Sequence, residues 1–144
     1  MFVATKNLIL QILFSIIMGI VDITEKNFSI EALLQSLKDD KTGAIVTFTG
    51  IVRKLDENKN IQRLDYECYR EMAMLELNKI VDSAKSKFDI LDISVIHRIG
   101  SISPQENVVG IVVTASHRED AFKACSFVID EIKKSVPIWK KEIL

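Results

Sequence analysis

The feature that most constrains the fold is a run of apolar residues at helical spacing in the last third of the chain. These residues recur at intervals of four, three and four, and they are Ala121, Cys125, Val128 and Ile132. Phe122 and Ile129 widen the stripe, which predicts an amphipathic helix whose apolar face lies on a sheet. An apolar run at residues 108–113 comes shortly before it, and polar residues 116–118 separate the two. The pattern therefore predicts a strand, a turn and a helix in that order.

The end of this predicted helix carries a cluster of basic residues. The helix cannot continue through Pro137, because proline lacks the backbone N–H and the residue before it avoids helical geometry. Four lysines flank the proline against one acid, Glu142, and they are Lys133, Lys134, Lys140 and Lys141. One interpretation is a solvated helix end followed by a basic tail. The other is an anion site, in which the turn folds Lys140 back toward Lys133 and Trp139 anchors that turn in the core.

Size and composition predict one globular domain that binds no nucleic acid. The chain has 144 residues, of which 48% are hydrophobic and 27% are charged, as is typical of a folded domain. Its net charge of −1 gives no overall attraction to nucleic acid, so any anion site must be local. Cys68 and Cys125 lack Cys-x-x-Cys spacing and predict free thiols in a reducing compartment, the cytoplasm. His97 and His117 show no paired ligand spacing, so no metal site is predicted.

Residues 1–17 are interpreted as an apolar extension upstream of the domain. Such an extension would result from a misassigned start, with Met18 as the true first residue. The apolar stretch at residues 8–21 has about 14 residues, fewer than the ~20 that a membrane-spanning helix needs. We therefore expect a single domain at residues 18–144. Two other interpretations stay open: a helix on a membrane surface, or an extra helix packed on the domain.

Apolar periodicity elsewhere predicts further strands and helices. Strands are expected at residues 20–24, 44–52, 61–69, 90–99 and 108–115, and helices at 30–37 and 71–88. The apolar face of the second of these helices consists of Ala73, Leu77, Ile80, Val81 and Ala84. Apolar residues on both faces of the strand at 44–52 predict a central position in the sheet, and the charged residues 54–60 predict a mobile surface loop. His97 and Arg98 are expected to pack or to form hydrogen bonds. The order of elements predicts an α+β fold, a mainly antiparallel sheet covered by helices.

Five sequence blocks resemble one known family in the same order and at proportionate spacing. They are GAIVTFTGIVR at residues 43–53, LDYECYREMA at 64–73, HRIG at 97–100, SHREDAF at 116–122 and KKSVPIWKKE at 133–142. Together they resemble the catalytic, or large, subunit of molybdopterin synthase, the MoaE family, over roughly residues 19–142. The resemblance implies an α/β-hammerhead fold.

The resemblance also implies a reaction and a partner. It implies the transfer of two sulfur atoms to cyclic pyranopterin monophosphate, which makes the dithiolene of molybdopterin in molybdenum cofactor biosynthesis. The sulfur donor that the resemblance implies is a ubiquitin-like small subunit with a thiocarboxylate at its C-terminal Gly-Gly. Two large subunits are expected to form a homodimer, each with a small subunit, in a heterotetramer. No cofactor is implied.

By motif match, the resemblance assigns catalytic roles to Lys133 and Lys140. The residues expected to bind substrate are these two lysines with Ile51, Val52, Arg53, His117, Arg118, Lys141 and Glu142. An arginine suits phosphate oxygens because its planar fork donates two parallel hydrogen bonds, whereas a lysine acts as a point charge and a proton donor. The alternative is a non-catalytic module that binds a ubiquitin-like tail or a small anion. Which lysine performs which step stays open.

Overall fold

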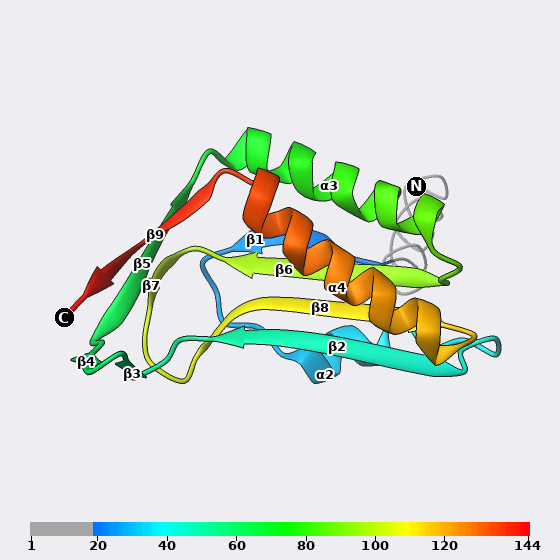
Figure 1. The fold of residues 1–144 in the computed structure, drawn as a ribbon, viewed down its shortest axis with the longest axis horizontal. Coiled ribbons are helices and arrows are strands. Elements are labelled where there is room, and N and C mark those ends of the chain that lie inside the picture. Colours follow the sequence, from blue (N-terminus) through cyan, green and yellow to red (C-terminus); the bar gives the residue numbers. More distant parts are fainter. Residues whose placement is uncertain (1–18) are drawn as a thin grey trace, which may run out of the picture.

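Two β-sheets of different size form the framework of the protein (Figure 1). The structure, a computed structural model, describes residues 19–144. The larger sheet has the order β1-β6-β8-β2, and its strands are β1 (Val21–Thr24), β6 (Asp92–Arg98), β8 (Asn107–Ala115) and β2 (Ala44–Ile51). The smaller sheet has the order β7-β5-β9, and its strands are β7 (Gly100–Ile102), β5 (Arg63–Cys68) and β9 (Ile138–Ile143). Only β1 and β6 pair in parallel among the described strands, so the predicted α+β fold with mainly antiparallel sheets is confirmed.

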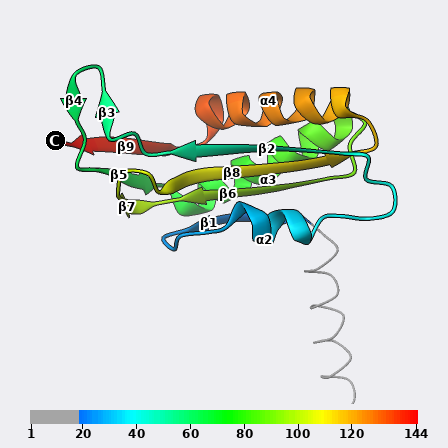
Figure 2. The same cartoon turned by 90° about the horizontal axis from the view of Figure 1, so that it is seen from below.

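Helices cover both faces of the larger sheet, and they are α2 (Ile30–Gln35), α3 (Arg70–Lys87) and α4 (Arg118–Ser135). Figure 2 shows α2 on the opposite side of the sheet from α4. Side chains alternate along each strand, so Val95 and Ile111 join the core under α3 and α4, whereas Ile96 and Val112 pack with α2. The predicted apolar face of α3 is buried along its whole length. That face holds the helix on the sheet, since burying each large aliphatic side chain contributes roughly 1.5–3 kcal/mol.

Strand β2 lies at the edge of the larger sheet, so the prediction of a central position is wrong. Both of its faces are nevertheless covered. Val46 and Phe48 pack against the core under the long helices, and Ile45 packs with the residues around α2. An apolar pattern indicates that other elements pack on both faces of a strand, but it does not indicate whether a neighbouring strand lies on each side.

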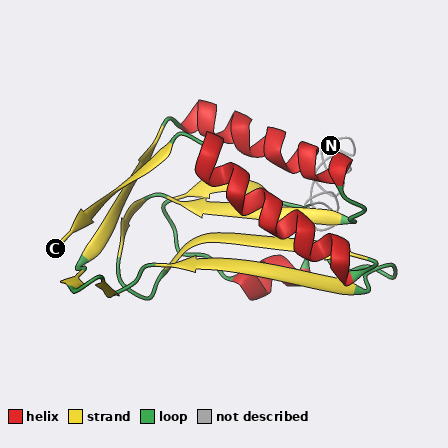
Figure 3. Cartoon of the chain, in the orientation of Figure 1, coloured by secondary structure: helices red, strands yellow, loops and turns green. Residues whose placement is uncertain are grey.

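The segment predicted to be a mobile loop at residues 54–60 is a tight hairpin (Figure 3). Its strands are β3 (Leu55–Asp56) and β4 (Lys59–Asn60). Glu57 and Asn58 have φ angles of 45° and 68°, the left-handed values that a two-residue turn of type I′ requires at both central positions. The charged composition indicated exposure correctly, but it did not reveal the turn. Strand β7 lies between the strands predicted at residues 90–99 and 108–115, where the sequence pattern predicted no element.

The chain beyond Pro137 forms strand β9, not a basic tail. Helix α4 ends at Ser135, as the proline predicts. Trp139 is 45% exposed and packs edge-on against Tyr69, so the expectation that it anchors the turn in the core is wrong. Phe122 is also exposed, because it lies one residue, or about 100°, away from Ala121 and therefore leaves the buried face of α4.

Three further expectations concern the thiols, the membrane and the start of the chain. Cys68 and Cys125 are free thiols, as predicted, and Cys125 is buried. Within residues 19–144, none of the helices combines the length and the hydrophobicity needed to span a bilayer. The proposed extension at residues 1–17 lies outside the described residues.

Candidate functional site

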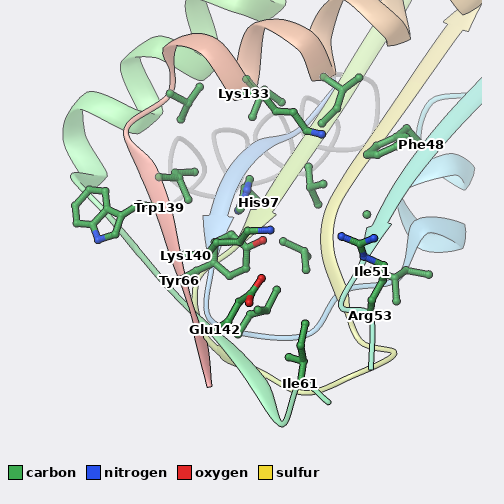
Figure 4. Close-up of a pocket in the computed structure, with 18 of the residues that line it drawn as sticks. Phe48, Ile51, Arg53, Ile61, Tyr66, His97, Lys133, Trp139, Lys140 and Glu142 are labelled. Carbon is green, nitrogen blue, oxygen red and sulfur yellow. The ribbon is translucent and has the colours of Figure 1, made fainter. Parts of the chain in front are cut away.

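A cavity of about 520 Å³ lies where the two sheets meet the last turns of α4 (Figure 4). One wall comes from β2 and the residues that follow it, another comes from β5 and β9, and α4 closes a third side. Its apolar lining consists of Phe48, Ile51, Ile61, Leu64, Val108, Val109, Ile129, Ile132, Val136, Ile138 and Trp139. This volume and this lining are typical of sites that enclose a small molecule or the end of a peptide.

Lys133 and Lys140 both line this cavity, as the anion-site interpretation predicts. Ile132 and Lys133 lie three and four residues after Ile129, so all three side chains lie on one side of the helix. Pro137 then ends the helix, and β9 brings Lys140 back along the cavity (Figure 4). Lys134 does not line the cavity and instead lies 3.7 Å from Glu131 on the solvent side of α4. The neighbouring lysines therefore have different surroundings.

The pairing of β9 with β5 decides which of its side chains enter the cavity. Lys140 lies opposite Tyr66 and Glu142 lies opposite Leu64, and all four residues line the cavity. Lys141 alternates to the other face, where it lies opposite Asp65. The expectation that Lys141 borders the substrate therefore finds no support within one subunit, because this lysine is not among the lining residues.

Arg53 enters the cavity from the end of β2, next to an irregularity in the strand pairing. Gly50 pairs with Val109, but Ile51 pairs with Asn107, so Val108 is skipped and both valines line the cavity. A side chain at Gly50 would come within 2.7 Å of the Val109 side chain, so glycine permits this close approach. Ile51 is exposed at the cavity, as expected.

Val52, also expected to bind substrate, has a side chain with no exposure. Its role is in the backbone. Its N–H donates to the carbonyl of Glu106 at 3.1 Å, and its own carbonyl accepts from Gln105 at 2.8 Å. These two bonds fix the chain just before Arg53. Val52 thus holds an arginine at the cavity but presents no side chain to a ligand.

Each acidic group at the cavity lies close to a cation. Arg53 is 3.2 Å from the carboxylate of Asp56, and Lys59 of the hairpin is 3.9 Å from that of Glu142. Exposed pairs of this kind contribute about 0–1 kcal/mol, so an incoming anion can compete with them. No such carboxylate partner is found for Lys133 or Lys140 among residues 19–144. These two lysines are therefore the cations most available to a ligand.

His117 and Arg118 lie at the start of α4, whereas the cavity borders its last turns, and Figure 1 shows how far apart the two ends of α4 lie. Both residues are exposed, and neither lines the cavity. Roughly 22 Å of helix axis separates Arg118 from Lys133, at about 1.5 Å per residue. The prediction that these basic residues converge with Arg53 and Lys133 is therefore wrong within a single subunit.

His97 belongs to the cavity, although it was predicted only to pack or to form hydrogen bonds. It is 6% exposed, its Nδ1 lies 2.8 Å from the carbonyl of Arg98, and its ring meets Tyr66 edge-on. Burial lowers the pKa of His97 and raises the pKa of Tyr66. Arg98 itself follows the prediction, since it donates to Glu106 at 2.6 Å. His97 follows Ile93 and Val95 at intervals of two, so its side chain lies on the same buried face of the strand. A polar residue on that face is the sequence signal that could have identified His97.

Comparisons with known proteins agree on one family. A sequence profile described as MoaE protein matches residues 23–135. A molybdopterin synthase catalytic subunit from Thermoplasma volcanium is 44% identical over 124 residues, which cover 86% of this chain and 90% of the relative. A crystal structure of molybdopterin synthase from Staphylococcus aureus has a TM-score of 0.80 at 36% identity and covers 84% of this chain and 88% of that chain.

A more distant structure has the same fold. It is a complex of subunits 1 and 2 of molybdopterin-converting factor from Helicobacter pylori, with a TM-score of 0.72 at 24% identity, covering 86% of this chain and 84% of that chain. The fold that the sequence resemblance implied is therefore confirmed. Since the profile spans most of the described residues and the identity extends over most of both chains, this chain belongs to the MoaE protein family.

Proposed function

We propose that the chain is the catalytic subunit of a molybdopterin synthase and that it acts as a sulfurtransferase. The observation that carries this proposal is that Lys133 and Lys140 line one cavity together with Arg53. The names of the relatives support the same activity. The proposed substrate is cyclic pyranopterin monophosphate, and the proposed products are molybdopterin and the desulfurated small subunit.

The cavity's residues match what sulfur addition requires. For each sulfur, a C–S bond forms on the substrate, a C–O bond breaks, and the departing oxygen takes a proton. Water then cleaves the thioester that joins the small subunit to the substrate, which leaves the tail as a carboxylate. A lysine ammonium can supply the proton, and the arginine fork can hold the phosphate. We assign proton donation to Lys133 and Lys140, and phosphate binding to Arg53.

The proposed sulfur donor is a ubiquitin-like small subunit whose C-terminal Gly-Gly carries a thiocarboxylate. The Helicobacter pylori structure, a complex of two subunits, supports a partner of this kind. Within the described residues, β9 pairs only with β5, so its other edge can accept an extended chain. A glycine tail has no side chains to clash with the cavity wall, and along this edge it would bring its terminal sulfur close to Lys140.

The position of His117 and Arg118 supports a role for a second copy of the chain. If both residues bind substrate, as the family resemblance implies, they must do so at the cavity of another subunit. We therefore propose a homodimer in which each α4 delivers its first turn to its partner's cavity. Together with one small subunit for each large subunit, this makes the proposed heterotetramer.

The proposal is tested by mixing the purified protein with the thiocarboxylated small subunit and the pterin precursor. Formation of the dithiolene product, detected by mass spectrometry after alkylation of its thiols, is the expected result. Binding of the small subunit without any product would instead support a non-catalytic module. A matched reaction with a small subunit that ends in an ordinary carboxylate must yield no product, because it carries no sulfur to transfer.

A further inference from the structure

His97 places an imidazole at the back of the cavity, where the proposed reaction assigns it no role (Figure 4). Strand β6 is central in the larger sheet and holds the ring from behind. Tyr66 meets the ring from the side at a centroid distance of 5.6 Å. The ring is thus fixed by a rigid strand and an aromatic neighbour, which are good conditions for a group that orients a ligand.

The hydrogen bond at Nδ1 determines which ring nitrogen carries the proton. The carbonyl of Arg98 can only accept, so Nδ1, at 2.8 Å, must donate. Burial disfavours the charged ring and lowers the pKa of His97, so the imidazole is neutral near pH 7. A neutral imidazole with a proton on Nδ1 has a bare lone pair on Nε2. Nε2 is therefore a hydrogen-bond acceptor.

The Nε2 atom also has access to the cavity. In residues 19–144, Thr114 Oγ1 is the one side-chain nitrogen or oxygen that is fully buried without a hydrogen-bond partner. Nε2 has no hydrogen-bond partner among the described residues either, so it is not fully buried, and the ring lines the cavity. An acceptor without a partner in a largely apolar cavity gains a hydrogen bond when a ligand brings a donor to it.

The charged side chains of the cavity provide no neutral acceptor, and the Tyr66 hydroxyl, which also lines it, can donate as well as accept. Arg53, Lys133 and Lys140 can only donate. The carboxylates of Asp56 and Glu142 accept, but each lies close to a cation. Imidazole Nε2 is thus an uncharged nitrogen acceptor on the side of the cavity formed by β6.

We propose that Nε2 of His97 accepts a hydrogen bond from an N–H group of the pterin ring system, and so orients the ring while the cations hold the phosphate. This inference rests on the proposed function, because it identifies the ligand as the pterin precursor. The reduced pterin ring carries several N–H donors, whereas inorganic phosphate carries no N–H group and is held by the cations of the cavity. His97 would therefore distinguish the precursor from other phosphates of similar size.

The first test is precursor binding by His97→Phe, measured by calorimetry. Phenylalanine keeps a ring against Tyr66 but removes the acceptor, so the dissociation constant is expected to rise about tenfold or more. Ile96→Ala is the matched control, because Ile96 is buried on the other face of β6 and packs with α2. The control should lower the melting temperature and leave the dissociation constant unchanged.

The second test uses the wild-type protein and does not depend on the folding of a variant. In nitrogen NMR of ¹⁵N-histidine-labelled protein, with His117→Gln used to assign the signals, Nε2 of His97 should resonate as an unprotonated nitrogen. Saturating precursor should then shift that signal toward a hydrogen-bonded position, whereas saturating inorganic phosphate should not.

The possible outcomes separate the two proposals. A protonated Nε2, a signal that the precursor does not move, or equal precursor affinity in wild type and His97→Phe would each overturn this inference. Those results would leave the proposed function intact. A wild-type protein that binds no precursor would overturn both.

Discussion

Lys133 and Lys140 lie on opposite sides of Pro137, one on the last turn of α4 and the other on β9, and both line one cavity. The proline ends the helix, and the alternation of β9 turns Lys140 toward the cavity and Lys141 away from it. Lys134, adjacent to Lys133, points to solvent near Glu131. These four lysines have the same side chain but different surroundings, so their substitution is expected to have different effects.

We expect Lys133→Ala and Lys140→Ala each to reduce sulfur transfer by at least ~10²-fold, the usual scale for loss of a proton-transfer group. Lys134→Ala is the matched control and should cost little. Lys133→Arg should not restore activity, because guanidinium keeps the charge but does not give up a proton. Single-turnover product formation measures these rates, and circular dichroism checks folding. Equal small losses in all three alanine variants would leave only a solvated basic helix end.

We expect Arg53→Ala to weaken precursor binding by about one to two decades, since a charge-assisted hydrogen bond contributes roughly 1.5–3 kcal/mol. Its affinity for the small subunit should remain close to that of the wild type. Arg63→Ala is the control, because Arg63 pairs with Asp65 on β5 and does not line the cavity. Calorimetric titration with each ligand measures both affinities. Unchanged precursor binding in Arg53→Ala would remove this residue from the phosphate site.

The proposed homodimer predicts that two inactive variants restore activity when they are combined. Arg53→Ala damages a subunit's own cavity, whereas His117→Ala damages the cavity of its partner. Co-expressed together, the two variants form mixed dimers with one intact cavity, so about a quarter of wild-type activity is expected from random pairing in a twofold dimer. Each variant expressed alone provides the baseline. A mixture no more active than that baseline would show that His117 does not act across the dimer.

We expect Cys125 to make the protein less stable at alkaline pH. Burial raises the pKa of its thiol from 9.0 to about 11, so the folded protein keeps a proton that the unfolded chain loses. The contribution of Cys125 to the free energy of unfolding should therefore be constant below pH 9. It should fall between pH 9 and 11, by at most about 1.4 kcal/mol per pH unit. Urea unfolding of wild type and Cys125→Ala measures the difference. The same decline in both proteins would show that another group is responsible.

Local pattern was sufficient to predict the parts of this protein that depend on local geometry. The apolar stripe from Ala73 to Ala84 predicted α3, because a helix repeats its faces within a few residues. Pro137 located the end of α4, because the residue before a proline avoids helical geometry. These predictions required no knowledge of how distant segments pair.

The parts that were missed depend on contacts between distant segments. No local signal places β2 at an edge, because strand order results from pairing with residues of β8 far along the chain. The separation of His117 from Arg53 has the same origin, since only the assembled sheet shows which end of α4 meets the cavity. His97 was assigned to packing or hydrogen bonding because it lies on a strand just before Gly100, and the open space in front of it appears only when β9 is in place.

The irregular pairing of Gly50 and Ile51, opposite which Val108 is skipped, has a consequence for how the length of this chain can vary among natural variants. Gain or loss of one residue there would move Ile51 and Arg53 to the opposite face of the strand, because side chains alternate with a period of two. The turn at residues 39–42 and the hairpin tip at Glu57 and Asn58 can change length without moving any residue that lines the cavity. Insertions and deletions are therefore expected to gather in those two turns and to be absent between Phe48 and Arg53.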